Sequence, residues 1–297
     1  MCIRDSPWGA IKRLDCYEQG TLSSLYICFK PYSHVSSDFL THYFETSKWH
    51  QGISEIAVEG ARNHGLLNVG IQDFFETRHC LPQSLLEQEK IAKFLNLIEE
   101  RIATQNKIIE KLQSLIKGIA QHCIKESTSG NTYVKLGDIC QITTGKLDAN
   151  AQVDNGIYPF FTCAEQPFKI DSFAFDTEAL LISGNGANLG YINYYKGKFN
   201  AYQRTYVLDL FSENIQYIKW ALKVLLPKRI AIEKSSSNTP YIVLSTLTDL
   251  RLPIPCKSKQ SFIANLMQSL ERKLSNQIAQ YDSYNYLKQY LLRQMFI

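Results

Sequence analysis

The sequence predicts an α+β fold: two mixed α/β domains, the first incomplete, and two long helices that pair antiparallel as a coiled coil. Three observations predict it. Two stretches without proline have a seven-residue apolar period, similar sequence precedes each of them, and strand-like segments with turn signals lie between them. The chain has 297 residues, of which 45% are hydrophobic, so two domains with substantial cores are feasible.

Apolar residues recur at the first and fourth positions of a heptad in both long stretches. In the first stretch these positions are Ile91, Leu95, Ile98, Ile102, Gln105, Ile109, Leu112, Ile116, Ile119 and Cys123. In the second they are Ile263, Met267, Leu270, Leu274, Gln277, Tyr281, Tyr284, Lys288, Leu291 and Met295. Such a sustained heptad predicts coiled-coil helices over 86–127 and 258–297, each of them about 60 Å long at 1.5 Å per residue.

The two stretches are copies of one unit. At an offset of 172 (263 − 91), Glu99 falls on Glu271 and Gln105 on Gln277. Because both copies have their glutamine at the same heptad position, we expect Gln105 and Gln277 to fix the register of the helix pair, at some cost in stability. Upstream, 68–74 matches 244–250 at an offset of 176. A domain, a proline-bearing connector and a long helix therefore occur twice.

The domain boundaries follow from this repeat. The polar segment 125–131 is a linker, and the second domain covers residues 132–257. The first domain, residues 1–85, is shorter, so we expect it to lack its beginning and to be less well packed. In it, we expect a helix from Ser37, capped by Ser37 or Asp38.

The second domain has a β-rich pattern. We expect strands at 133–136, 139–142, 179–183, 191–195 and 204–210. A helix over 215–226 should end at Pro227. The glycines of the segment 184–190 predict a tight turn that needs positive φ.

Several protein classes are excluded. The eight cysteines are scattered, with no CxxC pair, which indicates thiols of a cytoplasmic protein rather than disulfides or a metal site. The start resembles no signal peptide and no run of 18 apolar residues occurs, so we expect no membrane association. The net charge of +4 permits a nucleic-acid partner without predicting one.

Two segments resemble enzyme motifs, and neither is convincing. Gly184–Gly190 is followed by a strand pattern, so it offers no helix N-terminus for a pyrophosphate. Asn238–Tyr241 resembles the loop with which amino-methyltransferases hold a flipped base. A methyltransferase would also need a glycine-rich cofactor loop, which the upstream sequence does not supply. We therefore expect a chain without catalytic residues, with an N-6 adenine methyltransferase as a remote alternative.

Polar and basic residues of the predicted loops are candidates for DNA contact. Amides can bond adenine, Arg can bond guanine, Tyr can stack, and Lys can contact phosphate. The candidates in the second domain are Lys146, Asn185, Asn188, Lys198, Tyr202, Gln203, Arg204, Ser237, Asn238 and Thr239. Those in the first domain are Arg62 and Asn63.

The duplication indicates how these residues would be used. Two similar domains at opposite ends of a stiff antiparallel helix pair suit two half-sites separated by a fixed gap on duplex DNA. A coiled-coil scaffold that binds no DNA is the alternative, and salt dependence of duplex binding distinguishes the two.

The order of several segments resembles the specificity (S) subunit of bacterial type I restriction-modification systems. Leu25–Pro31, Asp38–Phe44, Gly65–Val69 and Leu86–Ala92 resemble the end of a target recognition domain that enters its long helix. Val134–Gly145 is similar to the opening of such a domain.

The resemblance implies that residues 1–85 are a partial first target recognition domain and residues 132–257 the second. Each would read half of a bipartite double-stranded DNA target. The helices would set the spacing and dock two modification (methyltransferase) subunits, alongside restriction and translocase subunits. S-adenosylmethionine, ATP and Mg would be bound by those partners, with no cofactor or metal in this chain.

Overall fold

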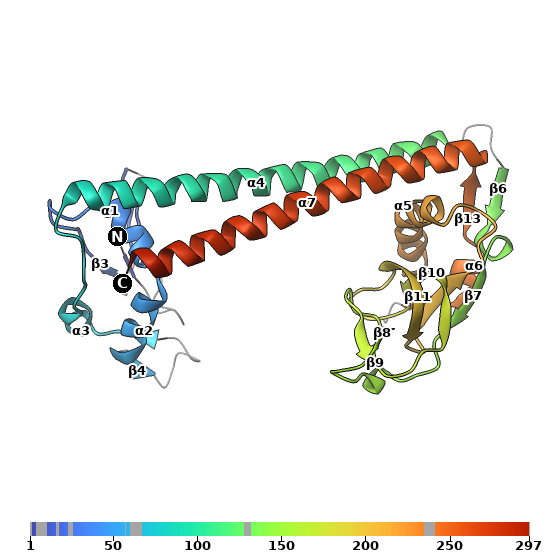
Figure 1. The fold of residues 1–297 in the computed structure, drawn as a ribbon, viewed down its shortest axis with the longest axis horizontal. Helices are drawn as coiled ribbons and strands as arrows, with labels where there is room; N and C mark the ends of the chain where they lie inside the picture. The colour runs from blue at the N-terminus through green and yellow to red at the C-terminus, as the bar shows by residue number, and fades with distance from the viewer. Residues whose placement is uncertain are drawn as a thin grey trace. The chain divides into compact units, whose positions relative to one another are not determined.

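The computed structural model describes residues 2–3, 11–15, 18–22, 26–56, 58–59, 67–127, 132–234 and 241–296 (Figure 1). Its contacts divide the chain into two compact units. The first unit is Met1–Glu110 with Ser275–Ile297, and the second unit is Lys111–Leu274. Two long helices, α4 (Leu85–Glu126) and α7 (Lys257–Met295), contribute to both units. No helix within the described ranges is long and apolar enough to cross a bilayer.

The long helices confirm the heptad prediction. Every predicted core position of both helices is buried or half-buried. In the first unit, Gln105 Nε2 donates to Gln277 Oε1 at 2.9 Å and to its backbone oxygen at 3.0 Å. In the same unit Lys288 bonds Glu99, so a later residue of α7 meets an earlier residue of α4. Within this unit the two helices therefore pair antiparallel, as predicted, with the glutamines in register.

The first unit combines very short strands with three helices. A three-stranded antiparallel sheet has the order β2-β1-β3, and β4 pairs with β5. The strands are β1 (Cys2–Ile3), β2 (Ile11–Lys12), β3 (Ile27–Cys28), β4 (Val58–Glu59) and β5 (Leu67–Asn68). The helices are α1 (Ser37–Tyr43), α2 (Ser47–Ile56) and α3 (Ile71–Glu76).

An aromatic core holds the described part of the first unit together. Phe39, Tyr43 and Trp49 are at most 5% exposed, and they pack with Leu95 of α4 and Leu292 of α7. The expectation of poor packing is therefore not met by these residues. The predicted helix cap is wrong by one position, because the N-cap is Ser36, whose hydroxyl accepts from the Phe39 amide at 3.3 Å.

The second unit contains a six-stranded sheet with the order β7-β12-β10-β11-β8-β9. The strands are β7 (Gln141–Thr144), β8 (Tyr158–Phe161), β9 (Phe168–Ile170), β10 (Phe175–Ser183), β11 (Ile192–Ala201) and β12 (Thr205–Asp209). A separate antiparallel pair joins β6 (Thr132–Lys135) to β13 (Arg251–Ile254). The strand expected at 139–142 begins two residues later, because a 3-10 turn, η1 (Leu136–Asp138), precedes it. A second such turn, η2, covers Ala149–Ala151.

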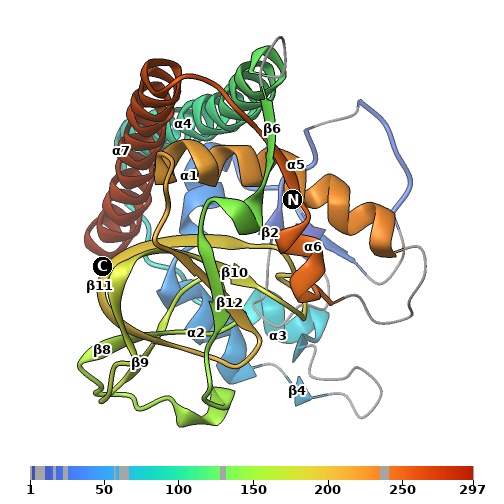
Figure 2. The same cartoon turned by 90° about the vertical axis from the view of Figure 1, so that its right-hand side faces the viewer.

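Helix α5 (Ile215–Lys234) lies against β10 and β11 (Figure 2). The prediction that it ends at Pro227 is wrong, since the proline lies inside the helix. A proline there removes one backbone hydrogen bond. Contacts beyond it compensate: Ile230 packs on the core, and Glu233 pairs with Arg229 at 2.9 Å and accepts from Thr246 at 2.6 Å.

The structure refines the internal repeat. Helices α3 and α6 (Leu244–Thr248) begin at Ile71 and Leu244, so the upstream offset is 173 (244 − 71) and the expected 176 is wrong. The first turn of each long helix contains a buried glutamine. Gln88 of α4 is 2% exposed, and Gln260 of α7 is 1% exposed. Their residue numbers differ by 172 (260 − 88), the offset of the repeat, and they make equivalent hydrogen bonds.

The equivalence is close in detail. Gln88 Oε1 accepts from the Ser36 amide at 2.8 Å, and its Nε2 donates to the Pro82 oxygen at 2.8 Å. Gln260 Oε1 accepts from the Asn214 amide at 3.0 Å, and its Nε2 donates to the Pro255 oxygen at 2.9 Å. Each glutamine of a long helix thus forms hydrogen bonds with the N-terminus of a domain helix and with the proline connector.

Candidate nucleic-acid interface

A tight turn between β11 and β12 carries two exposed side chains among the predicted DNA-contacting residues. The Thr205 amide donates to the Tyr202 oxygen at 2.8 Å, which closes the turn and leaves Gln203 and Arg204 at its centre. Both central side chains are exposed, whereas Thr205 is buried and Tyr202 is half-buried. The sheet therefore fixes the backbone of the turn while its amide and guanidinium groups face outward.

Backbone hydrogen bonds hold three other segments against this turn. The Gly184 amide donates to the Arg204 oxygen at 2.8 Å, and the Ile242 amide donates to the Gly184 oxygen at 2.9 Å. The Gln203 amide donates to the Leu147 oxygen at 2.9 Å, which brings the exposed Lys146 into the same region. Residues far apart in sequence thus adjoin in one region, which we call the turn surface: the exposed Lys146, Gln203 and Arg204, together with the buried Gly184 and Ile242.

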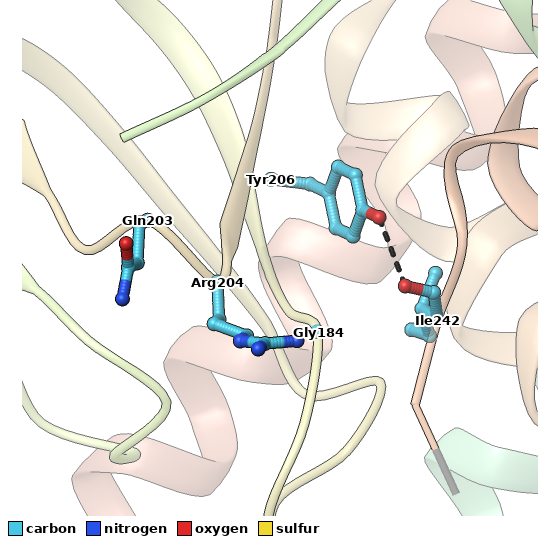
Figure 3. A pocket seen from close by; sticks show the side chains of 5 residues that line it. All are labelled: Gly184, Gln203, Arg204, Tyr206 and Ile242. Carbon is cyan, nitrogen blue, oxygen red and sulfur yellow. Dashed lines mark hydrogen bonds between the residues drawn. The ribbon is translucent and has the colours of Figure 1, made fainter. Parts of the chain in front are cut away.

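A small hollow opens at this surface. It has a volume of about 240 Å³ and is lined by Gly184, Gln203, Arg204, Tyr206 and Ile242. Figure 3 shows the side chains of Gln203 and Arg204 on separate sides of the turn, with the guanidinium group beside Gly184. The hollow therefore presents hydrogen-bond donors from Arg204 and both donor and acceptor groups from Gln203.

Tyr206 forms the inner wall of the hollow. Its hydroxyl donates to the Ile242 oxygen at 2.9 Å (Figure 3). Burial raises the pKa of Tyr206 although the positive charge of Arg204 lowers it. The hydroxyl consequently stays protonated at neutral pH and holds the segment at Ile242 in place.

Glycine is required where the segments come closest. A Cβ atom at Gly184 would lie 2.5 Å from the Arg204 oxygen, so any side chain there would displace the turn. Gly186 and Gly190 have φ of 78° and 81°, which confirms the predicted positive-φ turn. Strand β11 follows this turn, so no helix begins where a dinucleotide loop would need one.

Asn185 and Asn188 have structural roles that the sequence did not reveal. Asn185 Oδ1 accepts from the Cys163 thiol at 2.9 Å, and Asn188 Nδ2 donates to the Cys163 oxygen at 3.0 Å. Both asparagines are half-buried. They fasten the loop after β8 to the turn 184–190, and Cys163 is a residue whose place here no sequence motif predicts.

Two further residues do not lie at the turn surface. Asn200, which lies in the same polar segment as Arg204, is 4% exposed and donates to the Ser172 oxygen at 3.4 Å, so its amide is not presented at the surface. Lys198 is paired in register with Asp176, near the other end of β10 from Gly184. Its ammonium group lies 4.6 Å from the centre of the Phe173 ring. The candidates Arg62, Asn63, Ser237, Asn238 and Thr239 lie outside the described residues.

One group of side chains has the donor set of a metal site. His42, Glu45 and Glu99, in the first unit, place their ligand atoms within 4.8 Å of one another. Lys288 Nζ lies 2.7 Å from Glu45 and 2.6 Å from Glu99. The lysine ammonium group therefore already provides the positive charge that these carboxylates need.

Comparison with known proteins identifies the family. Residues 128–281, more than half of the chain, match the family described as type I restriction modification DNA specificity domain. Two relatives are the EcoDI type I restriction enzyme specificity subunit of Escherichia coli and a putative type I specificity subunit of Mycoplasma pneumoniae. The first is 44% identical over 137 residues and the second 27% over 154 residues. The matched regions cover 46% and 49% of this chain, but only 30% and 56% of the relatives' lengths.

Solved structures agree on the fold. The S subunit of a type I system from M. genitalium has a TM-score of 0.67 at 19% identity, covering 89% of this chain and 73% of that one. A chain from a structural study of assembly and conformational transition in a type I R-M system has a TM-score of 0.56 at 18% identity, covering 87% and 70%. The domain match over more than half of the chain, which includes the whole turn surface, shows that the chain belongs to the family of type I restriction-modification DNA specificity subunits.

Proposed function

We propose that the second unit recognises one part of a DNA target through the turn surface. The observation that carries this proposal is the exposed turn with Gln203 and Arg204, fixed by backbone bonds inside the region matched to DNA specificity domains. Arg can bond O6 and N7 of guanine, and Gln can bond N6 and N7 of adenine. Lys146 would contact a phosphate beside them, which positions the protein without reading sequence.

The bipartite form of the target is a further part of the proposal. The equivalent bonds of Gln88 and Gln260 support two copies of one recognition unit. The first unit would then read the second half of the target, and the paired helices would set the gap between the halves.

The partners also belong to the proposal. Two modification subunits would dock on the long helices and supply S-adenosylmethionine and the methyl transfer, and restriction subunits would supply ATP- and Mg-dependent translocation and cleavage. This chain would itself be non-catalytic and would act in the cytoplasm, where the cell's DNA is accessible to it.

The test is the methylation pattern that the chain directs. We expect coexpression with its modification subunits to place adenine methylation at a split motif, detectable by sequencing methylated genomic DNA. Exchange of residues 132–257 for the corresponding domain of another S subunit should change one half of that motif only. A motif that is indifferent to the exchange, or no motif at all, would refute the proposal.

The alternative of a scaffold without DNA binding has a separate test. Binding to phosphates releases counterions, so duplex affinity of the assembled complex should fall steeply as salt is raised. A complex whose affinity does not depend on salt, or that binds no duplex, would favour the scaffold.

A further inference from the structure

Lys288 is a charged residue at a core position of the helix pair. In the first unit its ammonium group bonds Glu99 of α4 at 2.6 Å and Glu45, which follows α1, at 2.7 Å. The lysine side chain is 17% exposed. Burial lowers the pKa of Lys288, but the bonds to the two carboxylates outweigh this effect and raise it. The side chains of Glu45 and Glu99 remain 44% and 39% exposed, and Lys288 contacts both, so without its ammonium group two like charges would lie close together.

The equivalent cluster of the second unit takes its positive charge from a different helix. Glu271, the repeat equivalent of Glu99, accepts from Lys219 at 2.8 Å and from Lys223 at 3.2 Å. Both lysines lie on α5, the domain helix, and the side chain of Lys219 is 9% exposed. Here the carboxylate is neutralised without any residue of the opposing long helix.

The opposing helix has an apolar residue at the corresponding place. At the offset of 172, Lys288 corresponds to Ile116, which is 6% exposed in the core of the second unit. Ser36 caps α1, and Asn214 caps α5. Glu45 and Lys223 lie equally far beyond these caps (45 − 36 and 223 − 214), so they are equivalent positions. The two clusters thus share a glutamate, Glu99 or Glu271, but take their positive charge from different positions: Lys288 of the opposing long helix in one, and lysines of the domain helix in the other.

The contact between Gln105 and Gln277 cannot by itself determine which long helices pair. Gln105 bonds Gln277, which is its own equivalent in the repeat. Two copies of α7 from different chains, or two copies of α4, would bring glutamine against glutamine in the same way. The apolar heptad positions are shared as well, so a second copy of this chain could compete for the same helix face.

We propose that Lys288 selects α4 as the partner of α7 and rejects a second copy of α7. In a pair of two α7 helices, Lys288 would meet a Glu271 that Lys219 and Lys223 already neutralise, leaving three ammonium groups around one carboxylate. In a pair of two α4 helices, Glu45 and Glu99 would face Ile116 without an ammonium group. Like charges that are partly removed from water disfavour both wrong pairings, which is specificity by repulsion.

The test detects which helix lies opposite residue 277. In the full chain, Gln277→Cys places a thiol beside Gln105 when α7 pairs with α4. When α7 pairs with α7, the same substitution brings the introduced thiols of two chains together. Oxidation after refolding would then link two chains only in the second case. The chain without Gln277→Cys is oxidised in parallel, and the amount of dimer that its native cysteines form is subtracted. The measurement is made at about pH 8, where thiols oxidise readily because a larger fraction is thiolate.

Charge variants of this reporter chain test the choice. Lys288→Glu would leave three carboxylates in the first unit but would neutralise the cluster of an α7–α7 pair. We expect the disulfide-linked dimer to rise at least about tenfold, the effect of about 1.4 kcal/mol. Glu99→Lys combined with Lys288→Glu restores one ammonium group between two carboxylates, and should return the chain to monomer. Lys273→Glu, at an exposed position of α7, should change nothing.

Folding is monitored by circular dichroism. If Lys288→Glu fails to fold, Lys288→Met replaces it, because it removes the repulsion without adding a carboxylate and should also increase the linked dimer. The proposal is overturned if folded Lys288 variants remain monomeric, or if Glu99→Lys does not reverse the effect of Lys288→Glu.

Discussion

Replacement of Gln260 by Ala tests the link between the long helix α7 and the domain that it supports. Gln260 is 1% exposed, and its amide group accepts from the Asn214 amide and donates to the Pro255 oxygen and to Glu213. The Ala variant leaves the Asn214 amide and the Pro255 oxygen without these partners. Each buried polar group that loses its partner costs about 1–3 kcal/mol, so we expect a loss of about 2–5 kcal/mol.

The assay is urea unfolding followed by circular dichroism, with hydrogen exchange at the Asn214 amide as a local measure. Gln280→Ala is the matched control, since Gln280 is exposed on the same helix and its side chain donates to the Tyr284 hydroxyl one turn away. It should change the unfolding free energy by no more than about 0.5 kcal/mol. A Gln260→Ala chain as stable as the control, with unchanged protection of the Asn214 amide, would refute the reasoning.

Three further results are expected. Gly184→Ala should displace the turn, because its Cβ would lie 2.5 Å from the Arg204 oxygen, and should weaken duplex binding by the assembled complex more than Gly52→Ala in α2, where a Cβ meets no atom within 4 Å; equal effects would contradict this. Tyr217→Phe should destabilise the chain by about 1–3 kcal/mol in thermal unfolding, because it leaves the Pro253 oxygen unpaired; no loss would contradict it. Burial raises the pKa of Tyr217 to about 12. Because the unfolded state loses this proton at lower pH than the folded state, the free energy of unfolding should fall between about pH 10 and 12. An equally steep fall in Tyr217→Phe would contradict this cause.

The long helices were predictable because their signal is periodic and local. The heptads of α4 and α7 and the Gln105–Gln277 contact follow from residue spacing and from the repeat offset. The end of α5 was not predictable, because contacts made by Ile230 and Glu233 outweigh the local effect of Pro227. Local sequence does not contain those tertiary contacts.

The site was predicted in part for the same reason. The polar segment was predicted as a DNA contact, but the sequence places Arg204 in the strand expected at 204–210, whereas β12 begins at Thr205 and both Gln203 and Arg204 lie exposed in the turn before it. The bonds of Asn185 and Asn188 to Cys163, and the burial of Asn200, depend on how distant strands are paired. Lys146 joins the turn surface because both of its neighbours bond the turn: the Gly145 amide donates to the Thr205 oxygen, and the Leu147 oxygen accepts from the Gln203 amide, a span of 56 residues (203 − 147).

Selection of duplexes from a randomised pool tests most directly whether the turn surface reads DNA. The complex of this chain with its modification subunits is compared with the same complex carrying Arg204→Ala, and with Arg272→Ala on the exposed face of α7 as control. We predict that Arg204→Ala relaxes preference at one base pair by about 1–3 kcal/mol, while Arg272→Ala selects the unaltered sequence. Identical selected sequences from all three complexes would contradict recognition through this turn.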